Sequence, residues 1–239
     1  MKARVLAGAH EVARAAADFV AQRVAARPQL VLALPTGRTP IPFYEELQRR
    51  HAAHTLDLSR ARAFNLDELV LPPGDPLAFR AFMERHAWEK IGLARERCDI
   101  PDGSAPDLEA ECQRYEEAIA AASGIDLAIL GVGVDGHVAY NLPGPVSLAT
   151  HLVTLPEAEA ASLGVAAGAP PLRAISMGLG TIRAAREVLL LATGPTKAPA
   201  IAALQRGVRD PAWPCTFLAD HAALSALVDG PAAGELRGP

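Results

Sequence analysis

The sequence has few cysteines, and their arrangement predicts neither a disulfide framework nor a zinc site. Its three cysteines, Cys98, Cys112 and Cys215, lie far apart, and no two form a Cys-x-x-Cys pair. Cysteines that are odd in number and widely spaced are typical of reduced thiols in a cytosolic protein. We therefore expect free thiols, no structural metal and a cytoplasmic location.

Long hydrophobic runs and an excess of positive charge are also absent. No run of about 18 apolar residues occurs, and the first residues have no apolar core typical of an export signal. Lysine and arginine number 23 against 27 aspartates and glutamates, which gives a net charge of −4. Because binding to nucleic acid or to anionic membranes normally requires a basic face, we expect neither partner.

Apolar residues are abundant, making up 50% of the 239 residues, enough to build one full core. Short apolar runs alternate with segments of helical spacing, which predicts an α/β fold: a single domain over residues 1–239 with a mostly parallel Rossmann-like sheet and helices on both faces. Between residues 145 and 171 the pattern weakens, so this segment is a candidate lid. Strands are expected at 4–7, 30–34, 62–66, 126–130, 173–178 and 188–192, and helices at 11–26, 41–50, 77–91, 107–122, 180–186 and 195–206.

The most informative segment is a glycine-rich loop that follows the apolar run 125–130 and contains Asp135 and His137. Ligands bind at the carboxyl ends of strands in open α/β sheets. A carboxylate beside an imidazole is well suited to moving protons near neutral pH. A purely structural histidine is the alternative; a metal site is not expected, because no third ligand accompanies the pair.

Two further loops contain candidate phosphate-binding groups. Thr36, Gly37, Arg38 and Thr39 lie between a predicted strand and a predicted helix, where backbone amides and hydroxyls suit a phosphate. Lys197 follows another strand and could neutralise the same phosphate. The alternatives are an ordinary glycine turn and a surface lysine.

Adjacent acids, Asp67 and Glu68, end the apolar strand predicted at 62–66. Such a pair is often a solvated helix cap. Its interest as a site comes from sharing one edge of the sheet with the other loops.

Several motifs together resemble the glucosamine-6-phosphate deaminase family, in the family's order from about residue 30 to 220. The 6-phosphogluconolactonases are more distant relatives with a similar Asp-Gly-His loop. The segments that carry the resemblance include Leu34-Pro-Thr-Gly-Arg-Thr-Pro40, Phe64-Asn-Leu-Asp-Glu68, the Asp135 loop, Met177-Gly-Leu-Gly-Thr-Ile182 and Thr193-Gly-x-x-Lys197.

The resemblance implies conversion of an amino-sugar phosphate to fructose 6-phosphate and ammonia without a cofactor. In this interpretation His137, supported by Asp135, opens the sugar ring, and Asp67 moves a proton from C2 to C1. The residues implied to hold the phosphate are Thr36, Gly37, Arg38, Thr39 and Lys197, and the candidate substrate contacts are Glu68, Gly136 and Asn141.

The chain departs from the family pattern at two places. Leu142 follows Asn141 where family deaminases usually have a glutamate, and residues 151–170 lack the arginine that usually reaches the phosphate from this region. The basic residues of the family's allosteric site are also missing there, so we expect no amino-sugar activator. A lactone hydrolase, in which His137 activates water, and a non-catalytic sugar-phosphate-binding protein therefore remain alternatives. Whether the protein is a monomer or a homo-oligomer is open.

Overall fold

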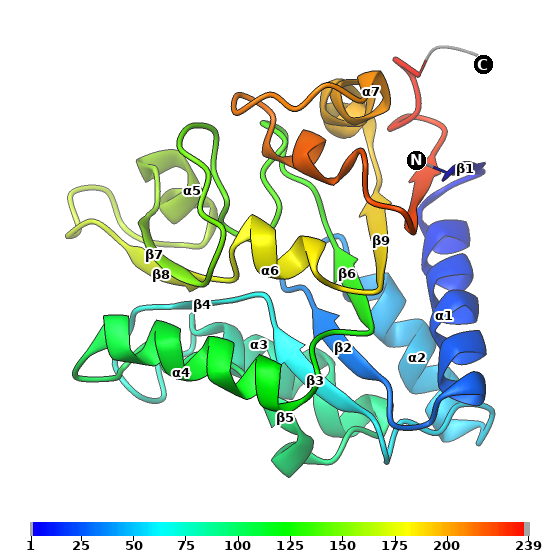
Figure 1. Cartoon of the computed structure of the whole chain (residues 1–239), viewed down its shortest axis with the longest axis horizontal. Helices are drawn as coiled ribbons and strands as arrows, with labels where there is room; N and C mark the ends of the chain where they lie inside the picture. Colours follow the sequence, from blue (N-terminus) through cyan, green and yellow to red (C-terminus); the bar gives the residue numbers. More distant parts are fainter. Residues whose placement is uncertain (1, 237–239) are drawn as a thin grey trace.

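A parallel sheet of seven strands forms the centre of the computed structural model, which describes residues 2–236 (Figure 1). All of its neighbouring strands run parallel. From one edge to the other the order is β1 (Lys2–Leu6), β10 (Leu224–Asp229), β9 (Glu187–Ala192), β6 (Leu127–Leu130), β2 (Val31–Leu34), β3 (Arg62–Asn65) and β5 (Cys98–Asp99). The predicted α/β class is confirmed, whereas the single domain over 1–239 stays a prediction, and its residues 1 and 237–239 lie outside the described part.

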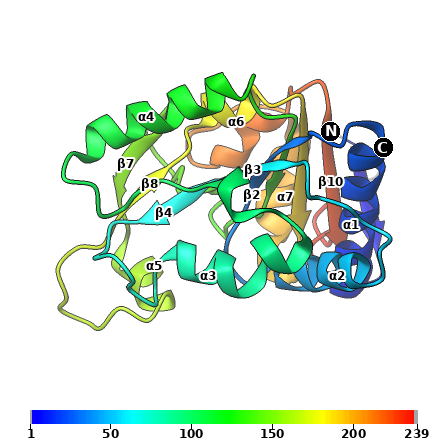
Figure 2. The same cartoon turned by 90° about the horizontal axis from the view of Figure 1, so that it is seen from below.

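Helices cover both faces of this sheet because its central strands alternate apolar side chains between the two sides. In β2, Leu32 and Leu34 pack into the cluster on one face, and Val31 and Ala33 pack into the cluster on the other. The first face is covered by α1 (Ala9–Ala26), α2 (Ile41–Ala52) and α3 (Phe79–His86), and the second by α4 (Leu108–Ala121), α6 (Leu179–Arg183) and α7 (Ala198–Arg206). The two helical layers are visible in Figure 2.

A second, antiparallel sheet lies beside the first and was not expected from the sequence. It contains β4 (Asp67–Leu69), β8 (Arg173–Ser176) and β7 (His151–Thr154), with β8 in the middle. The chain passes from β3 to β4 through Leu66, whose N–H donates to Leu34 O and whose carbonyl accepts from Met177 N. Asp67 therefore begins a strand of the small sheet rather than ending one of the large sheet.

One further expectation is wrong, and several elements were not expected. The helix expected over 77–91 is interrupted at Ala87, which has φ −129° and ψ −119° and is followed by the 3-10 helix η1 (Trp88–Ile91). This break allows both Trp88 and Ile91 to be buried. The weakly patterned segment 145–171 contains β7 and the short helix α5 (Glu157–Ser162), and β10 was overlooked. The remaining 3-10 helices are η2 (Arg95–Arg97), η3 (Pro195–Lys197) and η4 (Pro214–Leu218).

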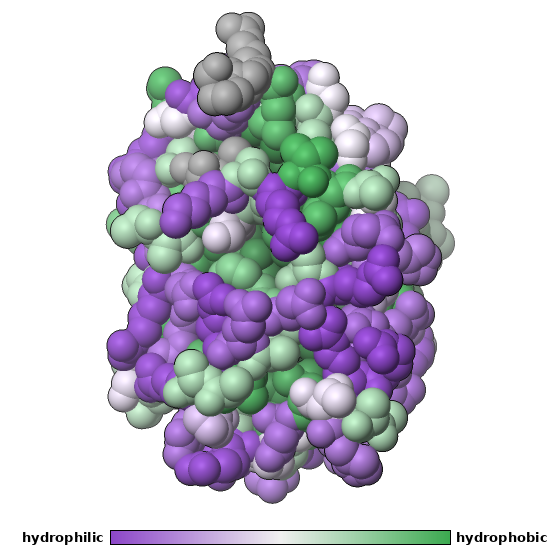
Figure 3. Space-filling view, turned by 90° about the vertical axis from the view of Figure 1, so that its right-hand side faces the viewer, coloured by the Kyte–Doolittle hydropathy of each residue, from purple (hydrophilic) through white to green (hydrophobic). Residues whose placement is uncertain are grey.

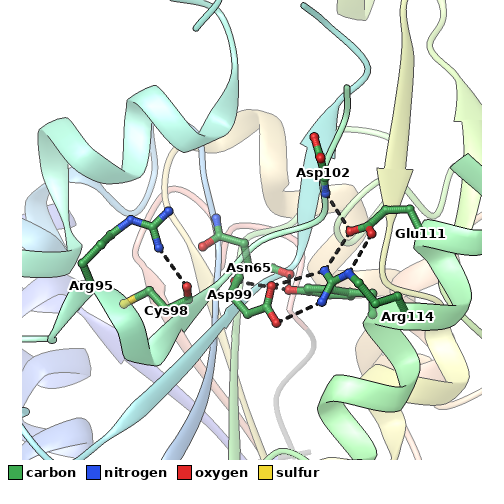
Figure 4. A network of polar contacts seen from close by, with 8 residues as sticks. Asn65, Arg95, Cys98, Asp99, Asp102, Glu111 and Arg114 are labelled. Carbon is green, nitrogen blue, oxygen red and sulfur yellow. Dashed lines mark hydrogen bonds and ion pairs between the residues drawn. The ribbon is translucent and has the colours of Figure 1, made fainter. Parts of the chain in front are cut away.

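A network of polar contacts fastens α4 to the end of β3 (Figure 4). Arg114 of α4 bonds both Glu111, at 2.7 Å, and Asp99 of β5, at 3.3 Å. The hydroxyl of the next residue, Tyr115, donates to the carbonyl oxygen of Asn65 at 2.6 Å. The last residue of β3 is thereby held in place two positions before Asp67.

The surface around α1 presents mostly polar side chains with smaller apolar areas between them (Figure 3). All three cysteines are free, as expected, and all three are buried. Among residues 2–236, no helix is both long and apolar enough to cross a membrane.

Candidate functional site

The predicted loops lie where the winding of the central sheet changes direction. β2 and β6 are neighbours, but the chain continues from β2 toward β3 and β5, and from β6 toward β9 and β10. The loops that follow β2 and β6 therefore diverge, and such a switch point is where open α/β sheets bind ligands. Residues 36–39 and 131–137 lie in these two loops.

Asp135 and His137 form a close pair in the loop after β6. The His137 Nδ1 lies 2.7 Å from the Asp135 Oδ1, and the His137 N–H donates to the same oxygen at 3.2 Å. Burial acts to raise the pKa of Asp135, but the bonds to His137 and its charge outweigh burial, so the pKa is lowered. Asp135 is therefore ionised at neutral pH and can orient the imidazole.

Glycines make this close pairing possible. A Cβ atom at Gly133 would lie 2.2 Å from the His137 Nδ1 and 2.6 Å from the Asp135 Oδ1. Gly136 has φ +81°, and a Cβ there would meet Trp213 at 2.9 Å. Any larger residue at either position would force the loop to move.

Asp67 approaches this pair from the start of β4. The residue is only 6% exposed, and its Oδ1 accepts a hydrogen bond from the Thr36 hydroxyl at 3.2 Å. Burial, reinforced by the charge of Glu68, raises the pKa of Asp67 to about 7, while the bond from Thr36 and the charge of His137 act in the opposite direction. Three chain segments, represented by Thr36, Asp67 and His137, thus meet at one site.

Two cations from different strand ends lie close to each other at this site. Burial lowers the pKa of Lys197, and the nearby charge of Arg38 lowers it further, against the opposing effect of Asp135. Within residues 2–236, neither Lys197 nor Arg38 forms an ion pair. The turn before Lys197 is anchored by Asp229 of β10, which accepts from the Gly194 N–H at 3.0 Å. Two neighbouring cations, neither of which forms an ion pair within the described part of the chain, suit a bound phosphate.

Glu68 points away from this chemistry and caps α3. Its Oε1 accepts from the Phe79 N–H at 2.6 Å, and its Oε2 accepts from the Arg80 N–H at 2.8 Å. Only 3% of Glu68 is exposed, so it is a buried helix cap rather than a solvated one. Its carboxylate is already engaged by backbone amides.

Asn141 and Leu142 complete the loop after β6. The Asn141 amide donates to the carbonyls of Val138 and Met177 at 2.9 and 2.8 Å, while its Oδ1 is buried without a partner among the described residues. Leu142 is half-buried and packs against the apolar cluster on the α1–α3 face. The position at which the family resemblance implies an acid therefore contributes to packing.

Sequence reasoning missed Tyr140 and Ser176. The Tyr140 ring stacks on Phe79 at 6.0 Å between centroids and lies 6.3 Å from the His137 ring. Its N–H donates to the Ser176 Oγ at 2.9 Å, which ties the histidine loop to β8. The register between β4 and β8, which places Ser176 opposite Asp67, has no sequence signal.

The chain matches, over residues 5–226, the family described as glucosamine-6-phosphate isomerases/6-phosphogluconolactonase. The chain belongs to this family. A family member from Arthrobacter sp. (strain FB24) named glucosamine-6-phosphate deaminase is 39% identical, covering 99% of this chain and 93% of the relative. One of the same name from Thermoanaerobacter pseudethanolicus is 37% identical, covering 98% and 94%.

Solved structures agree with this assignment. A structure described as a monomeric glucosamine-6-phosphate deaminase superposes with a TM-score of 0.92 at 33% identity, covering 98% of this chain and 100% of that one. A 6-phosphogluconolactonase from Trypanosoma brucei has a TM-score of 0.79 at 21% identity, covering 99% of this chain and 98% of that one, and shares the fold.

Within residues 2–236, no three His, Cys, Asp or Glu side chains gather as a metal site.

Proposed function

We propose that this family member is a glucosamine-6-phosphate deaminase that acts on a small sugar phosphate in the cytoplasm, without an organic cofactor or metal. The observation that carries the proposal is the buried Asp67, with its pKa raised to about 7, beside the His137–Asp135 pair. A carboxyl group with a pKa near the working pH can both take and return a proton.

In the proposed reaction, the 6-phosphate binds at residues 36–39 with Lys197. His137, held by the ionised Asp135, moves the proton that opens the sugar ring. Binding energy from the remote phosphate then holds C1 and C2 in position for reaction.

Asp67 takes the proton from C2 of the open chain and returns it to C1, while one proton passes from the amine nitrogen to the carbonyl oxygen at C1. A C2 imine remains. Water adds to the imine carbon, the C–N bond breaks, and fructose 6-phosphate and ammonia leave. Gly136 and Asn141 border the same loop and are proposed substrate contacts, whereas the engagement of Glu68 with α3 favours an indirect role for it.

A lactone hydrolase remains the second candidate because Leu142 leaves the ring-opening group without its usual acid. In that reaction His137 would take a proton from water as the water attacks a lactone carbonyl. Asp67 would then have no proton to carry between carbons, so its raised pKa favours the deaminase.

A panel of sugar phosphates tests the proposal. Glucosamine 6-phosphate is expected to give equal amounts of ammonia and fructose 6-phosphate, with no hydrolysis of 6-phosphogluconolactone above the uncatalysed rate. Lactone hydrolysis without ammonia would establish the second candidate, and binding without turnover would indicate a sensor.

A further inference from the structure

The short helix α5 lies on the side of the small sheet that carries Asp67 (Figure 2). In the pairing of β4 with β8, Asp67 stands opposite Ser176 and Leu69 opposite Ala174, so Asp67, Leu69 and Ala174 share one face. Leu69 and Ala174 belong to the same apolar cluster as Ala160 of α5. Figure 2 shows α5 beside α3 on one side of this sheet, with α4 on the other.

Glu159 is the acid of α5 that adjoins the residue packed on this face. It precedes the buried Ala160 and is itself half-buried. Among the described residues, its carboxylate forms no hydrogen bond or ion pair.

The negative charge of Glu159 acts on three groups of the site, and these groups lie in three separate parts of the chain. Burial is the largest cause of each pKa shift. The charge of Glu159 helps to raise the pKa values of Asp67 and Tyr140, and it opposes the lowering of the pKa of Lys197. Glu159 is thus an uncommitted carboxylate close to both the proton-carrying acid and the phosphate-binding lysine.

The chemistry of the proposed substrate suggests which group the Glu159 carboxylate binds. If the phosphate lies at Lys197 and Asp67 takes the C2 proton, C2 is beside Asp67. C2 also carries the amino group, which is an ammonium ion when protonated. The loop after β6 offers no acid for it, because Leu142 is apolar and Asp135 is committed to His137. An ammonium group paired with a carboxylate forms a charge-assisted hydrogen bond, which is stronger than a neutral one.

We propose that Glu159, presented by α5 over the face of the small sheet that carries Asp67, binds the C2 ammonium group and makes this protein select amino sugars over sugar phosphates without an amine. This inference rests on the proposed deaminase function. It assigns Glu159 to substrate recognition, a role that the sequence motifs do not indicate.

Glucosamine 6-phosphate and glucose 6-phosphate test the inference, because they differ only in the amine or hydroxyl at C2. Calorimetric titrations use Asp67→Asn protein to prevent turnover, at a pH at which the amine is protonated. Glu159→Gln is expected to weaken binding of glucosamine 6-phosphate about tenfold and of glucose 6-phosphate less than about twofold, as expected for losing one charged hydrogen bond. Glu157→Gln, an exposed acid on the same helix, removes the same charge and is expected to change neither affinity.

Three outcomes would overturn the inference: no change with either ligand, equal weakening of both, or tighter binding of both, which would mean that Glu159 opposes the phosphate. Ammonia release by the unmodified protein is measured separately. Its absence would refute the proposed function, whereas ammonia release with an unselective Glu159→Gln variant would refute only the role of Glu159.

Discussion

At the scale of single residues, the environments of Asp67 and Asp135 divide their roles. Burial raises the pKa of Asp67 to about 7, whereas the contacts with His137 lower the pKa of Asp135 in spite of its burial. Two carboxyl groups with pKa values moved apart are typical of one proton carrier and one permanently charged partner. Asp67 is therefore the proposed carrier, and Asp135 orients the imidazole.

Asp67→Asn is expected to lower kcat for ammonia release by about 10²–10⁴-fold, the usual contribution of a general acid–base group. The oxygen of an asparagine side chain can still accept the bond from Thr36, so the phosphate loop should be kept and the affinity for fructose 6-phosphate should stay nearly unchanged. Steady-state assays and calorimetry measure the two quantities. Near-normal turnover would remove Asp67 from the mechanism.

The same substitution predicts a change in stability with pH. Because the pKa of Asp67 is about 7 in the folded protein, against 3.8 for an ordinary aspartate, the folded state holds a proton that the unfolded state has lost between these pH values. The group therefore lowers the stability as pH rises from about 4 to 7, and the penalty is complete above that range.

Asparagine does not ionise, so Asp67→Asn is expected to raise Tm by about 2 °C or more near pH 8, and by less near pH 4. Asp135→Asn is the matched control: because the pKa of Asp135 is lowered, its loss should reduce Tm most at the higher pH. Differential scanning calorimetry at both pH values measures the shifts. A pH-independent Tm difference for Asp67→Asn would contradict the assignment.

Leu142→Glu should increase kcat for deamination several-fold, because it introduces the acid that the family resemblance implies for ring opening. It should also lower Tm, since Leu142 packs against the apolar cluster. Leu142→Gln introduces a side chain of the same shape as glutamate but without its charge. It should lower Tm without raising kcat. If Leu142→Glu leaves kcat unchanged or reduces it, the missing acid does not limit the rate.

At the scale of the elements, the loop after β6 depends on glycine to bring Asp135 and His137 together. Gly133→Ala would place a methyl group 2.2 Å from the His137 Nδ1, so the pair must separate. We expect kcat to fall at least about 100-fold, in the range of a lost general acid–base group, with phosphate binding retained.

Gly131→Ala in the same loop is the matched control, because a Cβ there meets nothing within 4 Å. It should keep near-normal kcat. Equal losses in the two variants, or full activity of Gly133→Ala, would show that the pairing of Asp135 with His137 is not what the loop provides.

Elements with strong local patterns could be predicted from the sequence, whereas those set by distant contacts could not. The buried run of β2 and the Asp107 cap of α4, which accepts from the Ala110 N–H at 3.0 Å, are local features. In contrast, β4 is three residues long, and β7 has no buried residue. Their pairing with β8 is fixed only by the folded arrangement.

At the scale of the whole molecule, the candidate site exists because the sheet changes its winding direction between β2 and β6. Motif spacing indicated which loops would meet there. It gave no indication of Tyr140 as a neighbour of His137, nor of Glu159, which lies on a helix in a segment with weak pattern. It also left open that Glu68 would cap α3. Side-chain direction and strand register, which these contacts require, are not encoded in local spacing.

The most direct test of the account follows the C2 proton itself. Glucosamine 6-phosphate deuterated at C2 is incubated with the protein, and the fructose 6-phosphate formed is analysed by NMR spectroscopy. Because Asp67 is 6% exposed and exchanges slowly with solvent in this account, part of the deuterium should appear at C1 as ammonia is released. Failure to release ammonia, or a product with no deuterium at C1, would contradict it.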